Sequence, residues 1–154
     1  MDLKPGDKAP VFKLPTDGGG EISSSGLKGT PYVVYFYPKD NTTGCTREAI
    51  DFTKLAKKFL DLGVTVIGVS KDDAASHDRF KTKHKLKLTL ASDVETKVAQ
   101  AFGIWVEKTQ YGRKFMGMER STFLVDKGGK IAAVWRKVKV DGHAEAVLAA
   151  AKSL

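Results

Sequence analysis

The sequence predicts an α/β fold in which a parallel β–α–β unit is followed by an antiparallel hairpin and a closing helix. Residues 32–37 and 64–69 form two continuous apolar runs, as expected of buried strands. A helical pattern separates these runs, so the crossover should be right-handed and the two strands parallel. Further on, residues 121–125 and 131–135 flank the turn sequence Asp126-Lys-Gly-Gly-Lys130, which is a strong hairpin signal.

The first half of the chain divides clearly into elements. The glycine-rich and serine-rich first thirty residues predict short edge strands and turns. After the strand over 32–37, a loop over 38–44 leads into a helix that starts near Cys45, because apolar residues then recur at spacings of three and four. Gly63 is the expected C-cap of this helix. A strand over 64–69 and a polar helix over 74–84 follow.

The second half predicts shorter elements. Residues 88–90 suit a short strand, 94–102 a helix that ends at Gly103, and 105–118 an excursion or hairpin. After the hairpin strands 121–125 and 131–135, apolar residues at helical spacing predict a final helix through 144–151. This order of elements is that of a thioredoxin-like α/β domain, with a central mixed sheet flanked by helices.

Length and composition limit the alternatives. The chain has 154 residues, which suits one globular domain over residues 1–154. Hydrophobic residues make up 42% and charged residues 29%, which excludes a disordered or collagen-like chain. No apolar run approaches the roughly 20 residues of a transmembrane helix, and residues 1–15 lack the apolar segment of a signal peptide. We therefore expect a cytoplasmic protein with no membrane partner.

The basic residues do not indicate nucleic-acid binding. The net charge is +8, a balance that can attract nucleic acids or anionic membranes. The lysines and arginines are nevertheless scattered, and the clusters at 81–87 and 136–139 are not interleaved with aromatic residues. A solvated surface explains them, so we expect no nucleic-acid partner.

The chain contains one cysteine, Cys45, which excludes an internal disulfide and an all-cysteine metal site. It lies where a strand passes into a helix, and ligands of α/β sheets bind outside the carboxyl ends of the strands. Unpaired N–H groups and the dipole of the first helical turn stabilise a thiolate, the reactive form of cysteine. A lone cysteine is most often a small buried hydrophobe, but the polar loop Asn41-Thr-Thr-Gly44 argues against a core position here.

The segment Tyr35-Phe-Tyr-Pro-Lys-Asp-Asn-Thr-Thr-Gly-Cys-Thr-Arg-Glu48 resembles the active-site signature of the peroxiredoxins, Pro-x-x-x-Thr-x-x-Cys with a glutamate three residues later. It is similar in particular to the peroxiredoxin Q, or bacterioferritin-comigratory-protein, subfamily. Residues 4–10, 102–108 and 119–126 resemble further blocks, so the similarity spans nearly the whole chain. The resemblance implies a thiol-dependent peroxidase for hydrogen peroxide and organic hydroperoxides, active in antioxidant defence and free of metal, haem or flavin.

The resemblance also implies roles for residues of the loop. Cys45 would be the peroxidatic nucleophile, which peroxide oxidises to a sulfenic acid. The hydroxyl of Thr42 would hydrogen-bond the thiolate and the incoming peroxide. Pro38 would shape the loop and shield the sulfur from water, and the backbone N–H groups of Gly44 and Cys45 would hold the peroxide oxygens.

Two charged residues complete the implied site. Arg120, at the start of the strand over 121–125, would stabilise the thiolate and the charge that develops on the leaving oxygen. Glu48 lies one helical turn after Cys45 and would orient the arginine rather than perform chemistry.

This chain departs from the family pattern in two ways. Thr43 stands where the family often has proline, which we expect to affect only loop stability. Many members also carry a resolving cysteine five residues after the peroxidatic one, or in the next helix. Here those positions are Ile50 and the neighbourhood of Lys81. We therefore expect an external thiol reductant, whether thioredoxin, glutaredoxin or glutathione, and a monomer or weak homodimer.

Three other functions compete with a peroxidase. A cysteine hydrolase would need a histidine and an orienting acid, which Asp141-Gly-His143 offers, although a histidine that opens the last helix is expected at the surface. A disulfide reductase would need Cys-x-x-Cys, and a non-enzymatic interaction module has only the +8 charge in its favour. His77 and His84 share a helix face, but a metal site would need a third ligand.

Overall fold

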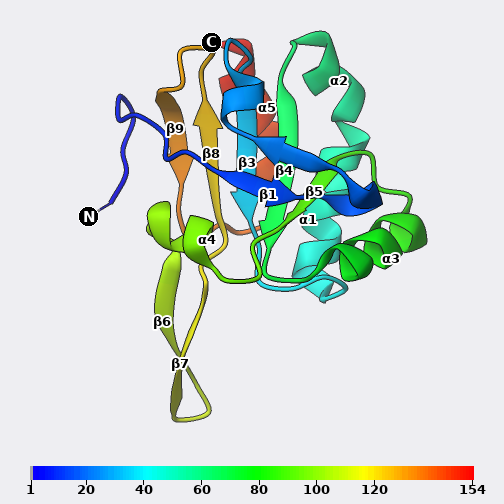
Figure 1. Ribbon diagram of the computed structural model, residues 1–154, viewed down its shortest axis with the longest axis vertical. Coiled ribbons are helices and arrows are strands. Elements are labelled where there is room, and N and C mark those ends of the chain that lie inside the picture. Colours follow the sequence, from blue (N-terminus) through cyan, green and yellow to red (C-terminus); the bar gives the residue numbers. More distant parts are fainter. Residues whose placement is uncertain (1) are drawn as a thin grey trace.

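The computed structural model describes residues 2–154 and has a five-stranded sheet at its centre (Figure 1). The strands lie in the order β5-β4-β3-β8-β9. Their bounds are β3 (Tyr32–Phe36), β4 (Thr65–Ser70), β5 (Thr89–Ser92), β8 (Ser121–Val125) and β9 (Ile131–Trp135). β4 pairs with β3 and β5 in parallel, whereas β8 pairs antiparallel with β3 and β9. The predicted parallel unit, hairpin and mixed sheet are confirmed.

A hydrophobic layer packs on each face of the sheet. One layer contains buried residues of α1 (Thr43–Lys54), α2 (Ala56–Asp61) and α5 (His143–Lys152), together with the β3 side chains that point to that face. The other layer joins α4 (Lys97–Ala101) to residues around the edge hairpin of β1 (Lys13–Pro15) and β2 (Glu21–Ser23). The alternation of side chains along β3 explains how one strand serves both layers.

The peripheral elements agree with their predicted positions. α3 (Ala74–His84) has the predicted bounds, and it lies beside β5 and the short 3-10 helix η1 (Asp17–Gly19). A second 3-10 helix, η2 (Ser25–Leu27), follows β2. β6 (Trp105–Gln110) and β7 (Arg113–Met118) form the predicted hairpin, which projects away from the sheet at the bottom of Figure 1.

One predicted helix is divided in two, and another is shorter than expected. The helix expected from Cys45 to Gly63 begins earlier, at Thr43, and is divided at Leu55. The N–H of Leu55 donates to the carbonyl oxygen of Phe52, three positions back, and not to that of the residue four positions back. The helix expected over 94–102 covers only Lys97–Ala101. Its start is fixed by the buried Asp93, whose carboxylate accepts the N–H groups of the first turn, a contact that periodicity does not reveal.

The sheet register places the ends of β3 and β8 side by side. Phe36, the last residue of β3, pairs with Ser121, the first residue of β8. Arg120 therefore lies at the edge where the loop after β3 enters α1, although Arg120 and Cys45 are far apart in sequence. Within residues 2–154, no helix is both long and apolar enough to cross a membrane.

Candidate active site

Cys45 lies in the first turn of α1, and the residue is only 1% exposed. It belongs to the hydrophobic layer that α1, α2 and α5 form. The expectation that the polar loop keeps this residue out of the core is wrong. Asn41, Thr42 and Thr43 are exposed, but the helix then turns Cys45 inward within one turn.

The guanidinium of Arg120 contacts the buried sulfur. Arg120 Nη2 donates to Cys45 Sγ at 3.2 Å, and Nη1 donates to Glu48 Oε1 at 2.6 Å. The planar fork thus joins a thiol and a carboxyl from the same face of α1, which a lysine would not match. Burial alone would lower the pKa of Arg120. The nearby Glu48 and Cys45 together raise this pKa by more, so it lies above its ordinary value and the guanidinium stays charged.

Glu48 is the most unusual titratable group of the site. Its side chain is 1% exposed, and Oε2 has no hydrogen-bond partner. Burial raises the pKa of Glu48 from 4.5 to about 7, although the charge and hydrogen bond of Arg120 act in the opposite direction. Glu48 contacts Arg120 as an orienting role requires, and that role stays a prediction.

The raised pKa of Glu48 predicts a pH dependence of stability. The folded chain favours the protonated Glu48 carboxyl. The stability that this group contributes is therefore fully present below pH 4.5 and is lost as the pH rises to about 7. Glu48→Gln should remove this loss, which is on the order of 3 kcal/mol because one pKa unit corresponds to about 1.4 kcal/mol. Urea unfolding of both proteins between pH 5 and pH 8 measures the difference. Parallel stability curves for wild type and variant would contradict the assignment.

Thr42 precedes α1 as its N-cap residue, but its hydroxyl donates to a partner other than the expected thiolate. Thr42 Oγ1 donates to the carbonyl oxygen of Lys39 at 2.9 Å, which fixes the loop from within. A hydroxyl has one hydrogen, so in this arrangement Thr42 can accept a hydrogen bond from a peroxide but not donate one to the thiolate. Pro38 is partly buried in the same loop.

Gly44 lies directly under the guanidinium. A Cβ atom at this position would be 3.2 Å from Arg120 Nη2, closer than ordinary van der Waals contact. Glycine therefore lets Arg120 approach the first turn of α1, where Cys45 follows. The sequence shows this glycine in the motif but not the contact that requires it.

Sequence reasoning did not identify Lys108 of β6 as a neighbour of the site. Its Nζ donates to the carbonyl oxygen of Met118, two residues before Arg120. Burial lowers the pKa of Lys108, the charge of Arg120 lowers it further, and Cys45 acts in the opposite direction. Side chains alternate between the two faces of a strand, so the sequence places Lys108 on one face of the β6–β7 hairpin. Only the three-dimensional structure shows that this face is directed to the end of β7.

The histidine of the competing hydrolase does not point to the thiol. His143 is buried, contrary to expectation, because Nε2 lies 2.8 Å from Thr122 Oγ1 and the ring packs edge-on against Phe52. Burial lowers its pKa to about 4, so the ring is neutral at neutral pH. Asp141 pairs with Arg47 instead. A thiol–histidine–acid arrangement is therefore not formed in residues 2–154.

The two histidines of α3 also have separate partners. His77 contacts Asp40 and the Ala91 carbonyl oxygen, whereas His84 contacts Asn41. No group of three or more potential metal ligands occurs in the described part of the chain. The two histidines on the shared helix face thus hydrogen-bond different partners.

A thioredoxin-like sheet with one thiol at the start of a helix, beneath an arginine, defines a class of thiol-dependent oxidoreductase. The model of the AhpC/TSA family matches residues 5–134, and the chain belongs to this family. It is 47% identical over 148 residues to a putative peroxiredoxin bcp of Coxiella burnetii, with 96% of this chain and 98% of the relative covered. It is 45% identical over 154 residues to peroxiredoxin Bcp of Bacillus subtilis, with 100% and 98% covered.

Solved structures agree with these relatives. A structure of peroxiredoxin Q from Xanthomonas campestris has a TM-score of 0.90 at 41% identity, with 99% of this chain and 96% of that chain covered. A mutant of PrxQ from Xylella fastidiosa has a TM-score of 0.93 at 38% identity, with 99% and 98% covered. The chain is thus a peroxiredoxin, an oxidoreductase that reduces a peroxide at the expense of a thiol.

Proposed function

We propose that Cys45 is the peroxidatic nucleophile and that the chain reduces hydrogen peroxide and small organic hydroperoxides in a one-cysteine cycle. The observation that carries this proposal is the 3.2 Å contact between Arg120 Nη2 and Cys45 Sγ, a positive charge on the single thiol of the chain. A related Xanthomonas campestris bacterioferritin comigratory protein is described as having alkyl peroxide reduction activity, which supports the same substrate class here.

The first half of the cycle oxidises the sulfur. The Cys45 thiolate attacks one peroxide oxygen, an S–O bond forms, and the O–O bond breaks with both of its electrons on the leaving oxygen. That oxygen takes a proton and departs as water or an alcohol. Arg120 stabilises the thiolate before attack and the leaving oxygen during it, because its charge is already in place and needs no reorganisation.

The remaining loop residues bind the peroxide. The N–H groups of Gly44 and Cys45, at the start of α1, hold its oxygens. The oxygen of Thr42 accepts a hydrogen bond from the peroxide, since its own hydrogen is directed to Lys39. Pro38 limits the access of water to the sulfur, and Glu48 orients Arg120 through the 2.6 Å contact.

The second half of the cycle needs a thiol from outside the chain, because Cys45 is the only cysteine. An external thiol attacks the sulfenic sulfur and releases water, which leaves a mixed disulfide at Cys45. A second thiol then attacks this disulfide and regenerates the Cys45 thiol. Glutathione, glutaredoxin and thioredoxin are the candidate reductants. We further propose a cytoplasmic location and a monomer or weak homodimer.

The absence of a second cysteine predicts the product of oxidation without reductant. One equivalent of hydrogen peroxide should raise the intact mass of the chain by one oxygen, and excess peroxide should add more as the sulfur becomes sulfinic and sulfonic acid. Glutathione added after the first equivalent should give a mixed disulfide instead. Mass spectrometry under non-reducing conditions measures all three products. A disulfide-linked dimer as the main product at one equivalent would contradict the external-thiol cycle.

A comparison of reductants tests the proposed cycle directly. Peroxide consumption is followed with glutathione alone, with glutathione and glutaredoxin, and with thioredoxin and its reductase. We expect turnover with at least one system and a linear dependence of the rate on its thiol concentration while resolution limits the rate. Turnover in none of the three systems, despite formation of the sulfenic acid, would refute these candidate reductants.

A further inference from the structure

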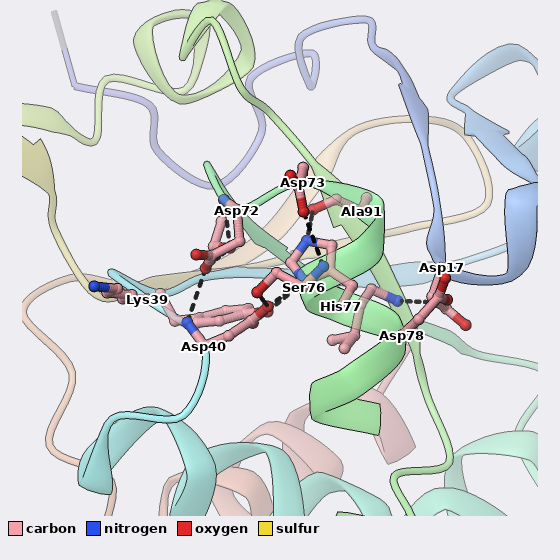
Figure 2. A network of polar contacts seen from close by, with 12 residues as sticks. Asp17, Lys39, Asp40, Asp72, Asp73, Ser76, His77, Asp78 and Ala91 are labelled. Carbon is pink, nitrogen blue, oxygen red and sulfur yellow. Dashed lines mark hydrogen bonds and ion pairs between the residues drawn. The ribbon is translucent and has the colours of Figure 1, made fainter. Parts of the chain in front are cut away.

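The loop that carries the active-site motif is held by a buried pair of titratable side chains outside the site itself. Asp40 lies in the loop between β3 and α1, and His77 lies on α3. The histidine side chain is 0% exposed and that of the aspartate 2%. Figure 2 shows the two side chains pointing toward each other, with Ser76 beside them.

Hydrogen bonds hold this pair in place from several elements. His77 Nδ1 lies 2.8 Å from Asp40 Oδ2, and Nε2 lies 3.0 Å from the carbonyl oxygen of Ala91. A carbonyl oxygen only accepts, so Nε2 carries a hydrogen. Asp40 also accepts the hydroxyls of Ser76 and Tyr37, at 2.8 and 2.6 Å. Both oxygens of the Asp40 carboxyl are therefore held by side chains.

The pKa of the aspartate agrees with this reading. Burial raises the pKa of Asp40, but the hydrogen bonds from His77, Tyr37 and Ser76, together with the charge of His77, hold it below its ordinary value. A carboxyl that is nearly fully buried and yet ionised needs hydrogen-bond partners around it, and His77, Tyr37 and Ser76 are the side chains that it contacts.

The pair acts on the backbone of the loop. The N–H of Asp40 donates to Asp72 Oδ2 at 2.8 Å, and Ser70 Oγ donates to the same oxygen at 2.7 Å. Asp40 is therefore fixed through both its side chain and its backbone. The next residue, Asn41, has a φ of +64°, and α1 begins two residues later. The position of Asp40 thus determines the direction in which the chain enters the first turn of α1.

We propose that Asp40 and His77 are positioning residues for peroxide reduction: their buried hydrogen-bonded pair fixes the loop over residues 38–44 and with it the first turn that holds Cys45. This inference rests on the proposed role of Cys45. Neither residue touches the sulfur in the described structure, so their effect passes through the loop backbone. Displacement of reacting groups by about 1 Å can reduce a rate by about 10²-fold.

The two halves of the cycle should respond to the pair in opposite directions. Peroxide attack needs the loop in place, because the N–H groups of Gly44 and Cys45 must face the peroxide. A thiol reductant is larger, and Cys45 as a residue is 1% exposed, so the loop must move before the reductant reaches the sulfur. A weaker anchor should slow the first step and speed the second. A general loss of stability would not separate the two rates in this way.

Asp40→Asn, His77→Gln and the double variant test the proposal. Asp40→Asn keeps the volume of the side chain and removes its charge, so it preserves the fold better than an alanine. Ile131→Ala is the control, because it leaves a cavity in the opposite hydrophobic layer and lowers stability without touching the loop. Stopped-flow measurements give the rate of Cys45 oxidation and, separately, the rate at which the sulfenic acid reacts with glutathione.

Each single variant should slow oxidation by roughly tenfold or more and accelerate the glutathione step. The double variant should be no worse than the single ones, since both substitutions remove the same pair. The control should change neither rate. Unchanged rates in both single variants, or additive losses in the double variant, would overturn the proposal.

One measurement does not depend on activity and so separates this proposal from that for Cys45. Hydrogen exchange of amides 39–46 should be at least about tenfold faster in both single variants than in the control. Equal exchange would refute the anchoring role, whereas full activity of Cys45→Ser would refute the nucleophile alone.

Discussion

Replacement of Cys45 by serine is expected to abolish peroxide reduction while leaving the fold intact. Serine is close in size to cysteine, so the buried position beside Arg120 can hold it, but a hydroxyl stays protonated at neutral pH and is a poor nucleophile. Peroxide consumption with an excess of thiol measures activity, and circular dichroism with thermal unfolding measures the fold.

A matched control lies in the same helical turn. Thr46→Ser changes a partly exposed side chain next to Cys45 and should keep the wild-type rate. If Cys45→Ser consumed peroxide at the wild-type rate, the chemistry would have to occur elsewhere, because the chain has no other thiol.

Replacement of Arg120 by glutamine is expected to slow peroxide reduction by roughly 10²-fold or more, the typical cost of losing one preorganised donor at a site of developing charge. The loss is expected because the cation that Cys45 Sγ contacts is gone. Arg120→Lys should recover only part of the rate, since an ammonium cannot contact the sulfur and Glu48 with a planar fork. Stopped-flow oxidation measures the rates of both variants.

Arg136→Gln is the matched control for this prediction. Arg136 forms a comparable ion pair, with Nε 2.6 Å from Glu119 Oε1, and its side chain is 26% exposed against 17% for Arg120. In the described structure, Arg136 forms no hydrogen bond with Cys45 Sγ. An unchanged rate in Arg120→Gln would remove Arg120 from the site, and equal losses in both variants would indicate a purely structural effect.

Most of the fold could be predicted because local patterns and long-range pairing agree. The apolar runs of β3 and β4, the helix between them and the Asp126–Lys130 turn each have a direct physical reading. The break at Leu55 and the late start of α4 could not be predicted in this way. Both depend on a hydrogen bond at a helix end, and such bonds leave helical periodicity unchanged.

The candidate site was predictable in its residue types but not in its geometry. Sequence resemblance indicates Cys45 and Arg120, yet the burial of the thiol contradicts the inference from its polar loop. A residue just after a loop is exposed or buried according to the direction in which the chain leaves the loop, which neighbouring residue types do not specify. The Asp40–His77 pair was missed for a related reason, since it joins residues 37 positions apart.

The register of β8 against β3 makes the protein unevenly tolerant of insertions and deletions. Arg120 reaches the thiol because Ser121 pairs with Phe36, and a slip of one residue would turn every side chain of β8 to the opposite face of the sheet. Length changes between Arg120 and the turn after β8 would therefore remove the guanidinium from the sulfur. The tip of the β6–β7 hairpin, at the exposed Tyr111, can change length without this effect, because β8 keeps its own pairing. Variation in chain length among functional relatives should thus be concentrated at that tip.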